Sequence, residues 1–130
     1  MPASATANYI QNKGYNAAVA LTKYRAVKFS AAETVTPVTG VTDVVAGIAQ
    51  FDVTAGEILR GKGASIAVEG DSIMEASEAI TIGQLVSVSA NGRAAVASAA
   101  ERQIGVCVEA ASGAGQFCRV KLDLPGTLVA

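Results

Sequence analysis

The segment 103–124 constrains the fold of this chain more than any other, because it predicts a β-hairpin. Two runs rich in β-forming residues, 103–109 and 117–124, flank the glycine-rich turn 110–116. Alternation makes one face of each strand apolar. The two apolar sets are Ile104, Val106 and Val108 in the first strand and Cys118, Val120 and Leu122 in the second. We interpret this hairpin as one side of a small β core.

A register for this hairpin follows from placing both apolar sets on the same face. It pairs Ile104 with Val120 and Val106 with Cys118, and it leaves Cys107 on the opposite face. A disulfide between Cys107 and Cys118 is therefore not expected, because their side chains would point apart.

The composition favours the same fold class. Aromatic residues make up only 5% of the chain and tryptophan is absent, so valine and isoleucine supply most of the burial, which favours strands. A length of 130 residues fits one domain. We expect a mainly β protein, a small barrel or roll of antiparallel strands with one or two short helical turns, in which residues 26–130 form the β domain.

Turn and capping signals divide the middle of the chain. Asn91-Gly92 predicts a two-residue hairpin turn. Thr54, with Glu57 three residues later, predicts a capping box on a short helical turn that ends at Gly61. Strands are expected at 25–30, 44–53, 64–70, 85–89 and 94–97, whereas 71–79 is expected to be an irregular, acidic surface segment.

Two glycines lie inside predicted strands. Gly47 and Gly105 occupy similar positions in a weak internal echo, in which the segments 45–49 and 104–107 are each followed by a glycine-containing turn. Glycine in a strand marks a bulge, a bend or the close approach of another backbone. We expect both glycines to help close the β core.

The first 25 residues differ from the rest and predict an extended N-terminal arm. They contain every tyrosine of the chain but no regular periodicity. One interpretation is that the arm packs on its own domain; the other is that it docks on a partner, because tyrosines suit interfaces. The docking interpretation makes residues 1–24 dispensable for folding and predicts an interface of Tyr9, Ile10, Tyr15, Tyr24 and Arg25.

The sequence contains no complete motif for catalysis, nucleotide binding or metal binding. Histidine is absent, which removes the commonest general base and metal ligand. The segment 56–63 follows a phosphate-binding loop except at Gly63, where magnesium binding needs a hydroxyl. The carboxylates of Glu69, Asp71, Glu75 and Glu78 match no calcium-binding loop. We expect no catalytic, metal-binding or cofactor-binding residue.

Charge and hydropathy limit the partners. A formal charge of -1 lacks the basic face of a nucleic-acid-binding protein. No segment approaches the ~20 apolar residues of a membrane span. We therefore expect synthesis in the cytoplasm, with neither nucleic acid nor membrane as a partner.

The segment from Gln50 to Gly70 resembles the capsid decoration, or cement, proteins of tailed bacteriophages, especially phages of actinobacterial hosts. The segments 21–28, 79–86, 90–93 and 104–108 also match, so the resemblance spans most of the chain from residue 21 to 122. It implies a small β domain on the outside of an icosahedral head. It also implies binding to the major capsid protein after expansion, homotrimers at threefold and quasi-threefold positions, and an N-terminal arm that reaches onto the shell.

Two other functions are alternatives to this one. A small non-enzymatic module that binds a ligand or carbohydrate on a virion surface is the alternative, although the β domain has few aromatic residues for stacking on sugars. The other is a nucleotide-binding or hydrolytic enzyme, which would need a hydroxyl in place of Gly63 or a general base such as histidine.

Overall fold

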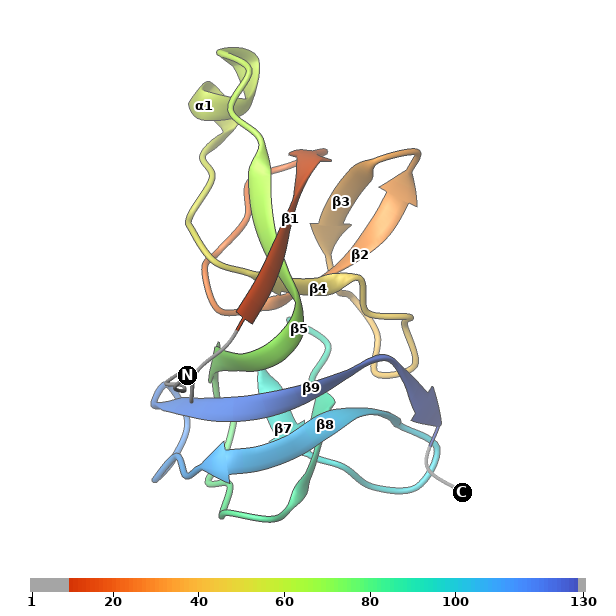
Figure 1. Ribbon diagram of the computed structural model, residues 1–130, viewed down its shortest axis with the longest axis vertical. Helices are drawn as coiled ribbons and strands as arrows, with labels where there is room; N and C mark the ends of the chain where they lie inside the picture. The colour runs from red at the N-terminus through yellow and green to blue at the C-terminus, as the bar shows by residue number, and fades with distance from the viewer. Residues whose placement is uncertain (1–9, 129–130) are drawn as a thin grey trace, which may run out of the picture.

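The computed structural model describes residues 10–128, which form nine strands and one short helix (Figure 1). The elements are β1 (Ile10–Ala17), β2 (Ala26–Ala31), β3 (Thr34–Pro37), β4 (Gly47–Ala49), α1 (Ala55–Leu59), β5 (Ala64–Glu75), β6 (Leu85–Val88), β7 (Ala94–Val96), β8 (Arg102–Glu109) and β9 (Phe117–Leu128). The predicted mainly β fold is confirmed. Within the described residues, no helix is long and apolar enough to cross a membrane.

Five strands close into a small barrel, which we call the barrel. Neighbours around it are β1, β3, β2, β4 and β5, and β1 returns to pair with β5 from Ile10 to Tyr15. The barrel is mixed rather than purely antiparallel, because β1 and β3 run parallel over two residue pairs. Strand β1 reaches β3 from its antiparallel pairing with β5, which fixes its direction.

The lower half of Figure 1 is an antiparallel sheet, which we call the terminal sheet. The second half of β5, from Asp71 to Glu75, pairs with β9, and the order continues through β8 and β6 to β7. A single bridge between Ala76 and Ala94 brings β7 back towards the end of β5. Strand β5 therefore belongs to both the barrel and the terminal sheet.

Two apolar cores correspond to this division. The smaller core fills the barrel and consists of Ala17, Leu21, Val27, Val35, Ala49, Val53, Ala64 and Ile66. The larger core lies under the terminal sheet and includes Ile48 and Ala67 from the barrel strands. Alternate residues of β4 and β5 thus face opposite cores, which is why all three residues of β4 are buried. The barrel covers one face of the terminal sheet.

Gly47 and Gly105 are both points of close backbone approach, as the sequence predicted. A Cβ atom on Gly47 would overlap the Ile66 side chain and the Ala67 carbonyl. A Cβ atom on Gly105 would overlap the carbonyl oxygen of Lys121 on the neighbouring strand. Each core therefore depends on one position without a side chain.

The terminal hairpin is confirmed, but its predicted register is wrong. Cys107, not Val106, lies inside, opposite Val120, and Val108 is exposed. The register shifts between Gln103 and Gly105 and again between Cys107 and Glu109. These shifts move the inward positions of β8 from even to odd residue numbers, whereas β9 keeps the predicted alternation. Both cysteines are consequently buried, and both are free.

Local signals around α1 and the β6–β7 turn are confirmed. Thr54 Oγ1 accepts from the Glu57 amide, and Glu57 Oε1 accepts from the Thr54 amide, which completes the capping box. The β6–β7 hairpin has the turn predicted at Asn91-Gly92, where Gly92 adopts a positive φ of 81°. The loop is longer than predicted, since the Gly92 amide bonds the Ser89 carbonyl.

Two segments expected to lie outside the β core are part of it. Residues 71–75 continue β5 instead of forming an irregular surface, because Ser72 and Met74 alternate inward against β9. Residues 10–17 form β1, and Leu21 is buried in the barrel. Of the two interpretations of the first 25 residues, packing on the domain therefore describes residues 10–25. Deleting residues 1–24 would open the barrel, contrary to the expectation that they are dispensable.

Candidate functional site

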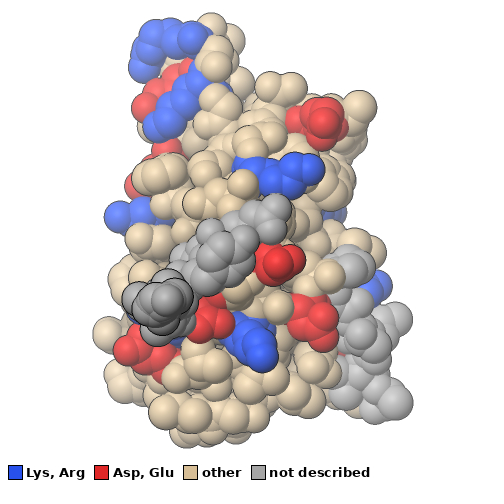
Figure 2. Space-filling view, in the orientation of Figure 1, with Lys and Arg blue, Asp and Glu red and all other residues tan. Residues whose placement is uncertain are grey.

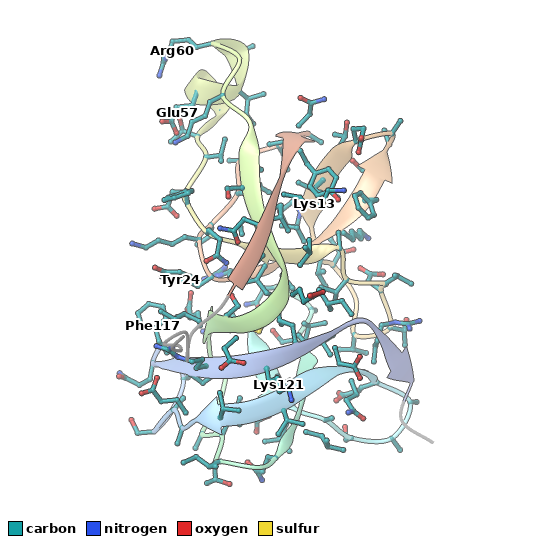
Figure 3. The ribbon with its side chains drawn as sticks, viewed as in Figure 1. Lys13, Tyr24, Glu57, Arg60, Phe117 and Lys121 are labelled. Atoms are coloured by element: carbon teal, nitrogen blue, oxygen red, sulfur yellow. The ribbon has the colours of Figure 1, made fainter. Side chains whose placement is uncertain are left out.

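The predicted interface residues do not form one cluster. Tyr9 lies outside the described residues, and Ile10 begins β1 opposite Gly70. Tyr15 pairs with Ala64 at the start of β5, whereas the Tyr24 carbonyl accepts from the Glu75 amide at its end. Figure 3 shows Tyr24 beside Phe117, far from the α1 tip with Glu57 and Arg60. The candidates thus separate into two groups, one on the barrel and one at the end of β5, where the two cores meet. We call this second region the junction.

Tyr15 belongs to a small aromatic contact on the barrel. Its ring meets Phe29 edge-on with the centroids 5.2 Å apart. Lys13 Nζ lies 5.7 Å from the centroid of the Tyr15 ring, at cation–π distance. Tyr15 is half-buried, and about half of the Phe29 side chain remains exposed.

Tyr24 belongs to a second aromatic contact, at the junction. Its ring meets Phe117 edge-on at 5.4 Å, and Phe117 is 52% exposed. Tyr24 has a positive φ of 64°, a conformation held by hydrogen bonds on both sides: its amide donates to Ala49 and its carbonyl accepts from Glu75. The backbone thus fixes an aromatic surface where β2, β4, β5 and β9 meet.

Arg25 is part of an ion-pair network across the same junction. Its Nε lies 3.1 Å from Glu75 Oε1, and Arg93 Nη1 lies 3.4 Å from Glu75 Oε2. The Glu75 side chain is only 18% exposed. The network connects the start of β2, the end of β5 and the β6–β7 hairpin. Arg25 therefore holds the junction together, and Glu75 neutralises much of its positive charge within the molecule.

The two thiols do not have the properties of nucleophiles. Burial is the main cause that raises the pKa of Cys118, to about 11, with the nearby Cys107 as a second cause. Burial also raises the pKa of Cys107. Both thiols are therefore protonated at neutral pH. No group of three or more potential metal ligands occurs within residues 10–128.

Exposed apolar side chains distinguish the surfaces of the molecule. Phe29, Phe51 and Phe117 are the few aromatic residues of the β domain, and all are at least half exposed. Sequence reasoning missed Phe117, although its position after a glycine-rich turn at the start of a strand was a signal. Ile82, Leu85 and Val108 are exposed on the terminal sheet and its neighbouring loop. In Figure 2 charged residues spread over most of the view, and only its lower end is uncharged.

Comparison with a solved structure supports the fold. The chain is similar to the N-terminal base of the head fiber protein gp8.5 of bacteriophage phi29, with a TM-score of 0.69 and 16% sequence identity. The match covers 94% of this chain and 100% of that one. At this identity the likeness concerns the fold alone. No curated protein matches in sequence.

A match to a family model shows which family the chain belongs to. The model described as phage cement protein matches residues 15–122, which is most of the 130-residue chain. The match includes the junction, most of the terminal sheet and the barrel strands apart from the first part of β1. The chain therefore belongs to the phage cement protein family.

Proposed function

We propose that this protein decorates the outer surface of an icosahedral phage head and stabilises the expanded shell. In this proposal it binds the major capsid protein, bridges neighbouring subunits and gathers as trimers at threefold and quasi-threefold positions. The observation that carries the proposal is the family match over residues 15–122. Synthesis in the cytoplasm of the host, an actinobacterial host and the absence of enzymatic activity belong to the same proposal.

The stabilisation would follow from binding equilibria rather than from chemistry. A protein that binds the expanded shell but not its precursor shifts the equilibrium towards the expanded state. Many copies on one shell add their effects, so each contact can be modest. A compact β domain without reactive thiols suits a role that consists of holding surfaces together.

We propose the junction as the contact with the capsid. Tyr24 and Phe117 form its aromatic part at the end of β5, and β1 begins further back along the same strand, where Ile10 pairs with Gly70 just before Asp71 enters the terminal sheet. Residues 1–9, including Tyr9, precede that point and supply the arm. Aromatic rings with one polar end favour interfaces that are part apolar and part wet. Contacts of Tyr15 and Arg25 with the capsid stay predictions.

Decoration of expanded heads that lack this protein tests the proposal. The full chain is expected to bind to saturation and to raise the temperature at which the heads disrupt. Deletion of residues 1–9, which spares every described strand, is expected to abolish attachment. Failure of the full chain to bind expanded heads would overturn the proposed function.

A matched pair of substitutions tests the position of the contact. Phe117→Ser is expected to lower occupancy of the heads at limiting protein concentration. Phe29→Ser, at a position of equal exposure on the barrel (51% against 52%), is the control and is expected to bind normally. Equal occupancy for both variants and the full chain would place the contact elsewhere on the molecule.

A further inference from the structure

The turn between β6 and β7 contains a chemically reactive step of the chain, Asn91-Gly92. The backbone nitrogen of a glycine can attack Cγ of the preceding asparagine, because glycine has no side chain to obstruct the approach. The new N–C bond closes a five-membered succinimide, and the side-chain amide leaves as ammonia together with the glycine amide proton. Water then opens the ring to aspartate or isoaspartate. Every other asparagine of the chain precedes a residue that has a side chain.

The folded structure restrains both reacting groups. The Gly92 amide, which is the nucleophile, donates to the Ser89 carbonyl at 2.9 Å, and the Gly92 carbonyl accepts from the Ala26 amide at 2.8 Å. The Asn91 side chain, which is the electrophile, is held at both ends. Its nitrogen donates to the Ser89 hydroxyl, and its oxygen accepts from the Arg93 guanidinium at 3.3 Å. Ring closure requires both groups to leave these hydrogen bonds.

Docking of the turn on the barrel maintains these restraints. Gly92 is buried, and a Cβ atom on it would lie 2.8 Å from the Ala26 carbonyl oxygen of β2. Arg93, the next residue, pairs with Glu75, which also pairs with Arg25. The turn can therefore rearrange only when the junction opens.

The products of the reaction do not fit the same position. Isoaspartate carries the main chain through its side-chain carbon, which adds one backbone atom immediately before Gly92, where the contact with Ala26 leaves no spare room. Both products also add a carboxylate that competes with Glu75 for Arg93. A junction that is modified while open cannot close as before.

We propose that Asn91-Gly92 is a self-modification site that the closed junction protects, and that modification there makes opening of the junction irreversible. Chemical change of an opened state converts an equilibrium into a lifetime, so the junction then sets how long the molecule stays intact. Asn91 is exposed, so water reaches the ring as soon as it forms. The inference concerns the chain itself and does not depend on the proposed function.

Peptide mapping by mass spectrometry tests the site. The full-length chain is incubated at mildly alkaline pH, folded or in urea, and conversion of Asn91 is followed by the mass gained when the amide becomes a carboxyl group. We expect conversion to be about tenfold or more slower in the folded chain, since protected groups react only through transient opening. Equal rates at Asn91 in both states would overturn the protection.

Asn16, which is exposed and precedes Ala17, is the internal control. It is expected to convert slowly in both states, because the side chain of Ala17 obstructs ring closure. In urea, conversion of Asn91 that is no faster than conversion of Asn16 would overturn the site.

Two matched variants test the role of the junction. Glu75→Gln removes the anion that holds Arg93 and is expected to speed conversion of Asn91 in the folded chain by about fivefold or more. Glu69→Gln makes the same change at an exposed position of the same strand and is expected to leave the rate unchanged. Identical rates for the two variants would show that the turn alone restrains Asn91.

Refolding tests the irreversibility. Chains aged in urea are refolded and separated by charge, and the modified chains are expected to unfold at a lower urea concentration than the unmodified ones. Asn91→Gln, whose longer side chain would have to close a less favourable six-membered ring, is expected to unfold identically before and after ageing. Modified chains as stable as unmodified ones would overturn the inference.

Discussion

The barrel and the terminal sheet differ in how their strand edges are paired and in how large an apolar core they need. The barrel is closed on itself by the pairing of β1 with β5, so its strands have no open edge and a small interior suffices. The terminal sheet is completed only by the bridge between Ala76 and Ala94, and it depends on a larger apolar core. Part of that core comes from the outer wall of the barrel. Backbone pairing between strands dominates in the barrel, and apolar burial dominates in the terminal sheet. Neither region forms a complete unit without the other.

Removal of β1 is the strongest test of this comparison. Deleting residues 1–24 opens the barrel and removes Ala17 and Leu21 from its core, so we expect the barrel to unfold. The terminal sheet should lose stability too, because barrel strands cover its core. Alkylation of Cys107 and Cys118, which are protected in the native sheet, reports on that loss.

The shorter deletion of residues 1–9 is the control for this experiment and should leave both thiols protected. Thiols that stay equally protected after the longer deletion would show that the terminal sheet folds independently of the barrel, against the interdependence described here.

Adding one methyl group at either close-approach glycine compares the two cores directly. Gly47→Ala and Gly105→Ala are each expected to lower the free energy of unfolding by about 3 kcal/mol or more, since the overlap involves backbone that must shift. Gly113→Ala, where a Cβ atom meets open space, is expected to change it by less than about 0.5 kcal/mol. Urea unfolding measures all three. A mild effect at only one of the two glycines would identify the more adaptable core.

Glu75 tests the coupling between the barrel and the terminal sheet. Glu75→Gln removes the charge between Arg25 and Arg93 and is expected to lower the free energy of unfolding by about 1 to 3 kcal/mol. Glu69→Gln, at an exposed position of the same strand, should have almost no effect. If the two variants unfold at the same urea concentration, hydrogen bonds and packing alone hold the junction.

Acid should affect both regions slightly and in the same direction. The hydrogen bond from Lys28 lowers the pKa of Asp43 in the barrel, and that from Ser87 lowers the pKa of Glu101 in the terminal sheet. A folded-state pKa below the unfolded value gives stability above the unfolded pKa, and this is lost as pH falls through the folded pKa.

Asp43→Asn and Glu101→Gln should therefore each cost less than about 1 kcal/mol near neutral pH, because both carboxylates are partly solvated. The difference from the unmodified chain should disappear at about pH 2. Unfolding curves at both pH values check this, and a cost that persists in acid would assign the effect to packing instead of charge.

Local rules in the sequence predicted much of this fold. The capping box at Thr54, the turn at Gly92 and the two close-approach glycines all depend on residues near one another in the chain or on a missing side chain. Strand β1 was missed because its pairing with β5 and β3 is set by distant residues and leaves no periodicity of its own. The register of β8 was missed because the shifts on either side of Gly105 cannot be read from alternation.

The candidate site was harder to predict than the fold. Tyr24 was identified from its residue type, but its partner Phe117 lies 93 positions away (117 − 24) and meets it only because both flank the end of β5. Arg25 was predicted to contact a partner, and in the structure its guanidinium forms an ion pair with Glu75 across the junction. Surface contacts of this kind depend on which strands become neighbours.

Strand β5 also determines how the molecule responds to force. Its 12 residues extend over about 40 Å of backbone, from beneath the α1 tip to the end of the terminal sheet (Figure 1). No flexible linker separates the two regions, and bending them apart would break pairings with β1, β4 and β9 together. A load applied at the tip would therefore pass along β5 to the terminal sheet through Gly70, whose positive φ of 91° lies where the strand leaves the barrel.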